Sequence, residues 1–211
     1  MDSFWKSEHD TDAYLLRIRS HIESISHTSE EDWQKFSTNL ECIKYKRKER
    51  IIKVGNVENF MYFLVKGAVM LMYPRNGMDY VIRFNFPGSF FNSYRSFISQ
   101  EPSELKIEAV SDVIAFRIGR NDLENFYRGS EEARIVGQKI LENYHFQKEQ
   151  REIAFLSRSA EENYLELMKN DPDLQNYIPL KYTASYLGVA PESLSRIRKK
   201  LATRSRIRIS V

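Results

Sequence analysis

The most constraining feature of the sequence is the stretch TASYLGVAPESLSRIRKKL, residues 183–201, in which one glycine separates two helical patterns. The first pattern places apolar residues at i, i+4 and i+7, namely Leu180, Ala184 and Leu187. Gly188 then permits the left-handed backbone that ends a helix. Pro191 suits the first turn of the next helix, because its missing N–H would have no helical partner there. The stretch therefore predicts two helices joined by a short glycine turn.

The second of these helices has one apolar face and one polar face. The apolar face carries Leu194, Ile197 and Leu201, and at about 100° per residue the opposite face carries Glu192, Ser195, Arg196 and Lys199. An arginine can donate two hydrogen bonds to guanine, and a glutamate can accept one from the cytosine amino group. Arg198 and Lys200 lie toward the flanks, where phosphates are expected. The spacing predicts a helix-turn-helix that reads DNA; an ordinary helical hairpin with a solvated charged face is the alternative.

The distribution of charge favours the same partner. Residues 176–211 contain eight Lys and Arg and a single acidic residue, Glu192, so this segment carries +7 in a chain whose net charge is +3. The preceding residues therefore carry −4. A basic segment favours a polyanion, because each neutralised phosphate releases condensed counterions. A solvated basic tail explains the charge equally well, so the helical spacing has to decide between them.

Residues 45–118 have the pattern of short β-strands. Continuous apolar runs cover 60–65 and 68–73, and Asn76-Gly77 then supplies the pair that favours a tight hairpin. In the run after the hairpin, alternation predicts one buried face, formed by Tyr80, Ile82, Phe84 and Phe86. Further strands are expected over 107–118. Several short strands separated by turns predict an antiparallel roll or barrel.

Helical patterns flank these strands. Before them, Thr28-Ser-Glu-Glu31 predicts a capping box at the start of a short helix. After them, Ser130 begins a long helix whose apolar face fades toward its end; the face carries Ala133, Val136, Ile140 and Tyr144. That face covers either the roll of its own subunit or a second subunit, and the sequence does not separate the two. A second capping box over Ser159-Ala-Glu-Glu162 marks a new helix. The expected domains are a sensing roll over 1–129, a long dimerisation helix over 130–157 and a DNA-binding domain over 158–211.

Residue usage excludes other classes of protein. Cys42 is the only cysteine, so neither an intramolecular disulfide nor a cysteine-bound zinc or iron–sulfur centre is expected. Residues 45–120 contain no histidine, which argues against a cupin-like metalloenzyme in the roll. We therefore expect no catalytic residues, no metal and no cofactor. The sequence has no run of about 18 apolar residues to span a membrane and no signal peptide pattern, so we expect a cytoplasmic protein without a membrane partner.

The segment PESLSRIRKKL resembles the helix-turn-helix of the Crp/Fnr family of bacterial transcription regulators, in the version common in Bacteroidetes members. The resemblance covers nearly the whole chain, including a roll with glycines like Gly55, Gly67 and Gly88. It implies an α+β fold: an N-terminal antiparallel, jelly-roll-like β-roll (a double-stranded β-helix) with flanking helices, a long dimerisation helix and a C-terminal winged helix-turn-helix. It also implies a homodimer on a palindromic operator in double-stranded DNA, with RNA polymerase and an unidentified small-molecule effector as further partners.

The resemblance also implies which residues touch DNA. Glu192 and Arg196 fall on base-reading positions, and the expected set is Glu192, Ser193, Ser195, Arg196, Arg198, Lys199 and Lys200. Two departures stand out, because Pro191 occupies a position that can carry an arginine and Ala190 replaces the usual Ser or Thr at the helix start. Alanine has no side-chain acceptor for the first N–H groups, which costs about 1 kcal/mol. The chain ends soon after Leu201, so only a short wing is expected.

The roll departs from the family as well. Members that sense cyclic nucleotides carry Gly-Glu and Arg-Ser pairs where this chain has Asn92-Ser93 and Ser103-Glu104. A buried phosphate would lack its cation and face Glu104, so no response to ordinary cyclic AMP is expected. The expected lining of an effector pocket is Phe84, Phe91, Asn92, Arg95 and Lys106, although the aromatic residues fit an ordinary core equally. The alternative function is a ligand-sensing module, like a cyclic nucleotide-binding domain, with no regulatory role on DNA.

Overall fold

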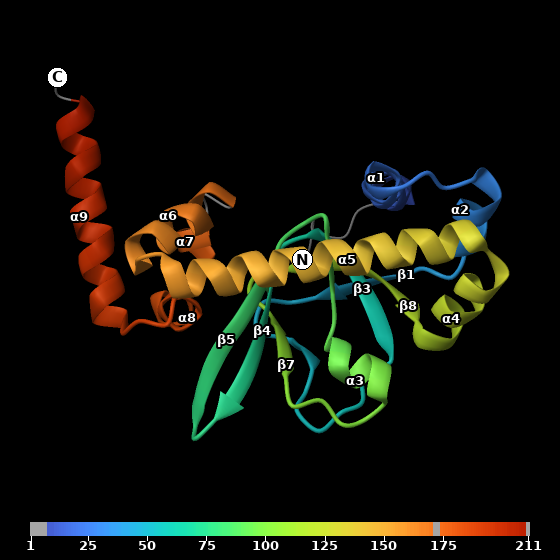
Figure 1. Cartoon of the computed structure of the whole chain (residues 1–211), viewed down its shortest axis with the longest axis horizontal. Helices are drawn as coiled ribbons and strands as arrows, with labels where there is room; N and C mark the ends of the chain where they lie inside the picture. Colours follow the sequence, from blue (N-terminus) through green and yellow to red (C-terminus); the bar gives the residue numbers. More distant parts are fainter. Residues whose placement is uncertain (1–7, 171–173, 210–211) are drawn as a thin grey trace. The chain divides into compact units, whose positions relative to one another are not determined.

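The computed structural model describes the backbone of residues 8–170 and 174–209, with side chains over 11–169 and 174–203 (Figure 1). Contacts within the chain divide it into two compact units. The first comprises Met1–Leu71 and Phe84–Phe146, and the second comprises Met72–Arg83 and Gln147–Val211.

The first unit is built on antiparallel strands. In the described part of the chain, one sheet has the order β1-β8-β3-β6 and the other β2-β7-β4-β5, and the tip of the β4–β5 hairpin belongs to the second unit. The strands are β1 (Glu41–Tyr45), β2 (Arg50–Ile52), β3 (Phe60–Lys66), β4 (Val69–Arg75), β5 (Met78–Asn85), β6 (Ser89–Phe91), β7 (Lys106–Ala109) and β8 (Val113–Gly119). The strand order pairs segments that are distant in sequence, so the predicted antiparallel roll is confirmed.

Helices surround these strands in the first unit and make up most of the second. The helices associated with the roll are α1 (Glu8–Ile25), α2 (Glu30–Ser37), α3 (Tyr94–Ser99) and α4 (Arg120–Gly129). The long helix α5 (Glu131–Ser157) begins in the first unit and ends in the second. The remaining helices are α6 (Ala160–Asn170), α7 (Leu174–Tyr177), α8 (Leu180–Tyr186) and α9 (Pro191–Ile209).

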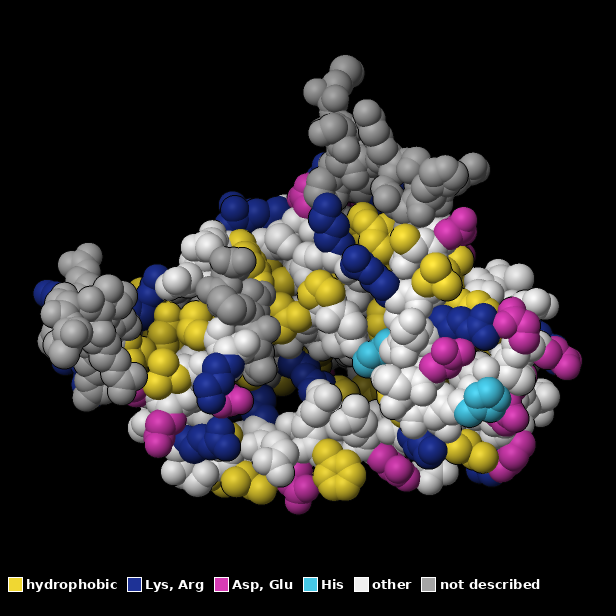
Figure 2. All heavy atoms as spheres, turned by 90° about the horizontal axis from the view of Figure 1, so that it is seen from above, with side chains coloured by type: hydrophobic (Ala, Val, Ile, Leu, Met, Phe, Trp, Pro, Cys, Tyr) yellow, Lys and Arg dark blue, Asp and Glu magenta, His cyan; other side chains and the backbone are white. Residues whose placement is uncertain are grey.

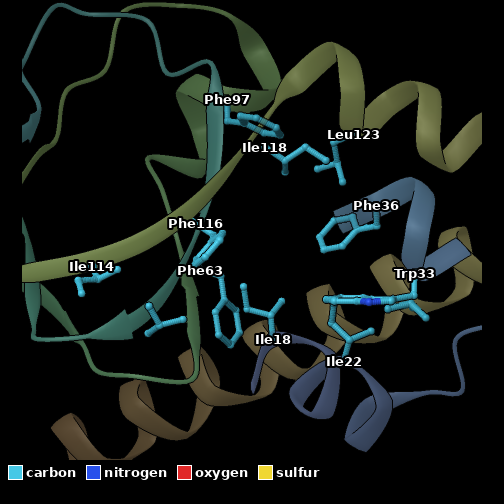
Figure 3. Packing of buried hydrophobic residues seen from close by; sticks show 12 residues of the cluster. Ile18, Ile22, Trp33, Phe36, Phe63, Phe97, Ile114, Phe116, Ile118 and Leu123 are labelled. Carbon is cyan, nitrogen blue, oxygen red and sulfur yellow. The ribbon is translucent and has the colours of Figure 1, made fainter. Parts of the chain in front are cut away.

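The core explains why residues 60–65 read as an unbroken apolar run. Successive side chains of β3 point to opposite faces, and both faces are covered. Tyr62 and Leu64 pack into a cluster between the sheets, whereas Phe63 and Val65 pack into a second cluster with α1 and α2. Figure 3 shows Phe63 in this second cluster together with residues of the two helices. A strand buried on both faces needs no polar alternation.

Two turns of the roll depend on glycine. Gly67, between β3 and β4, has φ +85°, and a Cβ at this position would lie 2.2 Å from the backbone oxygen of Asp112. Asn76 and Gly77 both have positive φ, 52° and 73°, which is the geometry of the tight hairpin that the Asn-Gly pair predicts. The predicted hairpin between 68–73 and the following strand is therefore confirmed.

The helix cap at the start of α2 lies one residue later than the sequence predicts. Ser29, not Thr28, caps α2, and its side chain accepts a hydrogen bond from the backbone N–H of Asp32. The predicted pair Thr28 and Glu31 matches the sequence rule, whereas the observed cap Ser29 is followed three residues later by Asp32. The tertiary structure decides, because Thr28 is buried and the backbone N–H of Ser29 donates to Glu132 at the start of α5.

The predicted buried face of β5 is wrong over its first half. Val81 is buried, whereas Tyr80 and Ile82 are exposed. The backbone N–H of Val81 donates to Ser185 Oγ of α8, whose hydroxyl in turn donates to the carbonyl of Asp79, so the first part of β5 contacts α8 within the second unit. The last part of β5 belongs to the first unit, where the consecutive residues Phe84 and Asn85 are both buried. The strand therefore does not keep one period-two alternation, because its two parts belong to different compact units.

The second unit contains the predicted second capping box. The backbone N–H of Ser159 donates to Glu162 Oε2 at 2.8 Å, and the N–H of Glu162 donates to Ser159 Oγ at 3.3 Å. This reciprocal pair starts α6, as predicted. The expected short wing after Leu201 is not found in the described residues, where α9 continues to Ile209. Helix propagation past Leu201 meets no glycine or proline that would end it.

Candidate functional site

The turn between α8 and α9 brings the two helices into contact. Gly188 has φ +68°, as its role in ending α8 requires. A Cβ on Gly188 would lie 2.8 Å from the ring of Phe155, so the position excludes larger side chains on steric grounds as well. The two helices share a small core of fully buried Ala184 and Leu194 together with Leu187 and Tyr164. Partly buried residues complete the core: Met168, Leu180, Tyr186, Val189, Ile197 and Leu201.

This core fixes the rotation of α9 about its axis. With Leu194 fully buried, residues on the opposite side of the helix face solvent. We call this side the α9 ridge; its members, all exposed, are Glu192, Ser195, Arg196 and Lys199. Ser193 is half-buried beside the ridge, and its hydroxyl accepts a hydrogen bond from Arg196 Nη2 at 3.2 Å. Four of the seven predicted DNA-binding residues thus lie together on one exposed surface.

The two flanking cations make contacts inside the second unit. Arg198 Nη2 donates to Gln175 Oε1 at 2.9 Å, and Lys200 Nζ lies 2.5 Å from Glu161 Oε2 of α6. The Arg198 contact is a hydrogen bond to a neutral amide, whereas Lys200–Glu161 is a surface ion pair, a kind that contributes roughly 0–1 kcal/mol. Both contacts join α9 to other segments of the second unit, which sequence periodicity does not reveal.

The five predicted effector residues lie in different surroundings. Phe84 and Phe91 are buried, and Phe91 stacks on Tyr62 with ring centroids 5.0 Å apart. Asn92 Nδ2 donates to the backbone carbonyl of Phe60 at 3.4 Å. Arg95 is exposed and pairs with Glu101 and Glu104, and Lys106 is half-buried on β7. The two aromatic residues are thus part of the core, which was the alternative interpretation.

Two serine side chains, at positions where nucleotide-sensing relatives contact the nucleotide, are hydrogen-bonded to each other. Ser93 and Ser103 are both 2% exposed, and their hydroxyl oxygens are 2.7 Å apart. Ser103 Oγ also donates to the carbonyl of Leu105 and accepts from its N–H. The hydrogen bonds that a phosphate and a ribose would need from these positions are therefore used within the protein.

A buried carboxylate lies next to this pair. Glu58 is completely buried, and its two oxygens accept from the backbone N–H groups of Phe60 and Ser93. Burial raises the pKa of this carboxyl to about 7, although the backbone hydrogen bonds and the nearby Arg117 oppose the shift. The sequence analysis missed Glu58, because one glutamate in a loop carries no periodic or motif signal.

The described residues contain no group of three or more His, Cys, Asp or Glu side chains placed to hold a metal ion. On the face drawn in Figure 2, the histidine side chains lie apart among hydrophobic, basic and acidic groups. His21 packs against the rings of Phe63 and Phe90, and burial lowers its pKa. Among the described helices, none is long and apolar enough to cross a membrane.

Comparison with known proteins finds a family match for one segment of the chain and several solved structures with a similar fold. Residues 42–130 match the family model of the cyclic nucleotide-binding domain. FixK2 from Bradyrhizobium japonicum is similar in structure, with a TM-score of 0.67, 20% identity and coverage of 79% of this chain and 86% of that one. A putative cAMP-binding regulatory protein from Silicibacter pomeroyi gives a TM-score of 0.65 at 19% identity, covering 91% of this chain and 88% of its own.

A third similar structure is CLP from Xanthomonas campestris, a c-di-GMP responsive global regulator. Its TM-score is 0.64 at 13% identity, covering 84% of this chain and 93% of that one. A search of curated proteins gives no significant match. Residues 42–130 thus match the cyclic nucleotide-binding domain family, and the chain shares its fold with FixK2, CLP and the protein from Silicibacter pomeroyi.

Proposed function

We propose that the protein is a sequence-specific DNA-binding transcription regulator that acts as a homodimer. The observation that carries this proposal is the α9 ridge, where Glu192, Arg196 and Lys199 are exposed on one side of a helix whose other side is packed. Arginine and glutamate on such a ridge can read guanine and cytosine edges in the major groove. The basic surroundings add affinity for phosphates on any sequence.

Dimerisation is supported by a stripe of exposed apolar residues on α5. The packed face of α5 carries Ala133 and Val136, both buried in the first unit. The stripe lies on the other side of the helix, and its members are Ile135 (38% exposed), Phe146 (64%), Ile153 (51%) and Leu156 (85%). Their spacings of 11, 7 and 3 residues match the repeat of a two-helix seam. One face of the long helix thus packs within the first unit, and the exposed stripe is the face that we propose contacts a second subunit.

We expect Phe146→Glu to convert the dimer to a monomer, because a charge would be buried without a partner in the seam. Light scattering after size exclusion measures the change directly. Leu141→Glu is a matched control, since Leu141 is 44% exposed on the same helix but about 140° around it from Phe146. A dimer that persists in Phe146→Glu, or dissociates only in Leu141→Glu, would place the interface elsewhere.

The roll is not expected to respond to ordinary cyclic AMP. The hydroxyl groups of Ser93 and Ser103 are hydrogen-bonded to each other, and the completely buried carboxyl of Glu58 lies beside them. A phosphate arriving there would displace these hydrogen bonds and would be buried where desolvation already disfavours the ionised form of Glu58. Titration calorimetry with cyclic AMP should show no binding at micromolar concentrations, and a micromolar dissociation constant would refute this part of the proposal.

The base-reading role is tested with Arg196. After selection of a consensus from random DNA, Arg196→Ala should weaken binding to that site by about 1–3 kcal/mol, or roughly 5- to 150-fold. Binding to random DNA should change much less, so the specificity ratio falls. Fluorescence anisotropy on both duplexes at fixed salt gives the two affinities.

Arg158→Ala is the matched control, because it removes the same charge from the second unit without touching the α9 ridge. Its effect on the specificity ratio should be small. Equal losses on selected and random DNA for Arg196→Ala would make this residue a phosphate contact. A purified dimer that ignores DNA at low salt would favour the alternative, a ligand-sensing module with an incidental basic tail.

A further inference from the structure

The first unit contains an apolar cavity beneath the N-terminal half of α5. Its volume is about 60 Å³. Its walls come from α1, α2, α4, α5 and the outer face of the β1-β8-β3-β6 sheet, with Ile22, Trp33, Phe36, Ile118 and Leu123 among the lining residues. Figure 3 shows these five side chains grouped in one cluster, Phe36 lying between Trp33 and the pair Ile118 and Leu123. The cavity lies outside the region of Ser93 and Ser103, which do not line it.

One polar group in this cavity has no partner. Thr28 lines the cavity, is 6% exposed, and its Oγ1 is buried without a hydrogen bond. An unsatisfied buried hydroxyl destabilises the folded state, which is why most such groups are paired. The remaining lining is almost entirely hydrocarbon and aromatic. A guest that formed a hydrogen bond with Thr28 and filled the apolar space would therefore be stabilised both by that bond and by contact with the apolar walls.

The lining of the cavity selects against a charged guest. None of the residues that line it carries a charge, and Thr28 and Tyr127 supply its only side-chain hydroxyl groups. An ion buried there would lose its hydration without gaining a partner of opposite charge. A guest that approaches Thr28 with its polar end is therefore neutral.

We propose that this cavity binds a small neutral apolar molecule carrying a single hydrogen-bonding group, with that group on Thr28. An engineered cavity of about 150 Å³ accommodates benzene, so a smaller cavity suits a guest of only a few non-hydrogen atoms. Four lining residues, Ala133, Val136, Gly137 and Ile140, belong to α5, so occupancy bears directly on the helix that leads to the second unit. That regulatory consequence rests on the proposed function, whereas the binding itself does not.

The binding test uses methyl NMR of the full-length protein with xenon, 1-propanol and propanoate as probes. Xenon and 1-propanol should give saturable shifts of the Ile22, Ile118 and Ile140 methyl groups, and propanoate should give none. Xenon reports the apolar space alone, 1-propanol adds the hydroxyl, and propanoate replaces it with a charge. Failure of both xenon and 1-propanol to shift these methyl groups, or equal binding of propanoate, would overturn the proposal.

Thr28→Val separates the polar contact from the apolar space, because valine is similar in shape and lacks the hydroxyl. It should change the dissociation constant of xenon by less than twofold and raise that of 1-propanol at least fivefold. Unchanged 1-propanol affinity would show that Thr28 takes no part. Ala133→Val, which adds volume at the α5 wall, should weaken both guests; circular dichroism checks its folding, and Thr28→Val keeps the test intact if that variant fails to fold.

A separate measurement addresses regulation. DNA affinity of the wild-type dimer, with and without saturating 1-propanol, should differ, and Thr28→Val should reduce that difference. If the guest shifts the methyl resonances but DNA affinity does not change, the cavity binds ligands without regulating DNA binding. Absence of DNA binding altogether would contradict the proposed function while leaving the cavity result in place.

Discussion

Leu194→Ala should lower the free energy of unfolding of the second unit by about 2–5 kcal/mol. Leu194 is fully buried between α8 and α9, in contact with the cluster formed by Tyr164, Ala184 and Leu187. Truncation removes transfer free energy and leaves a cavity in a core of only a few residues. Because this core sets the rotation of α9, DNA affinity should fall on selected and random sequences alike. Thermal unfolding and fluorescence anisotropy measure the two effects.

Two controls make this result specific. Leu194→Met nearly conserves volume and should cost less than about 1.5 kcal/mol. Ser195→Ala, one residue along, changes an exposed position on the α9 ridge and should alter stability by no more than about 0.5 kcal/mol. A Leu194→Ala protein with unchanged stability and unchanged binding would show that the helix-turn-helix core does not hold the ridge in place.

The second large effect is a loss of stability with rising pH that is caused by Glu58. Its pKa is raised to about 7 in the folded protein, compared with about 4.5 for an unperturbed glutamate. Between these two values the folded state binds more protons than the unfolded state, so the free energy of unfolding falls as pH increases. At about 1.4 kcal/mol per pKa unit, the loss between pH 4.5 and 7.5 is on the order of 3 kcal/mol.

The surroundings of Glu58 support this sign. Desolvation is the main cause of the raised pKa, and hydrogen bonds from the backbone of Phe60, Ser93 and Asn59, with the charge of Arg117, only reduce it. Glu58→Gln removes the titration and should flatten this part of the stability profile measured by urea unfolding from pH 5 to 8. Glu104→Gln, at a mostly exposed carboxylate, should leave the profile unchanged. A wild-type profile that rises over this interval would contradict the assignment.

Glu58 and the Ser93–Ser103 pair also bear on how this domain differs from a nucleotide sensor. All three side chains are buried, and they use their hydrogen-bonding capacity on each other or on neighbouring backbone groups. The region is therefore a structural polar core. If the protein responds to a small molecule, the cavity at Thr28 is the better site on physical grounds, because its polar group is unpaired and its walls are apolar.

The sequence by itself determined the elements whose signal is local. The Asn76-Gly77 hairpin, the Ser159–Glu162 capping box and the left-handed Gly188 each depend on a few adjacent residues, and all three are present in the structure. The α9 ridge was also predictable, because a helical period and one apolar stripe define the opposite face.

The tertiary structure alone decided features that depend on distant partners. The burial along β5 depends on the two compact units to which its parts belong, and the pairing of Lys200 depends on Glu161. The raised pKa of Glu58 depends on burial among residues such as Ser93, more than 30 positions away. The cavity at Thr28 arises from imperfect packing among four helices and three strands that meet only in the folded chain. Burial and packing are sums over non-local contacts, so a local pattern cannot specify them.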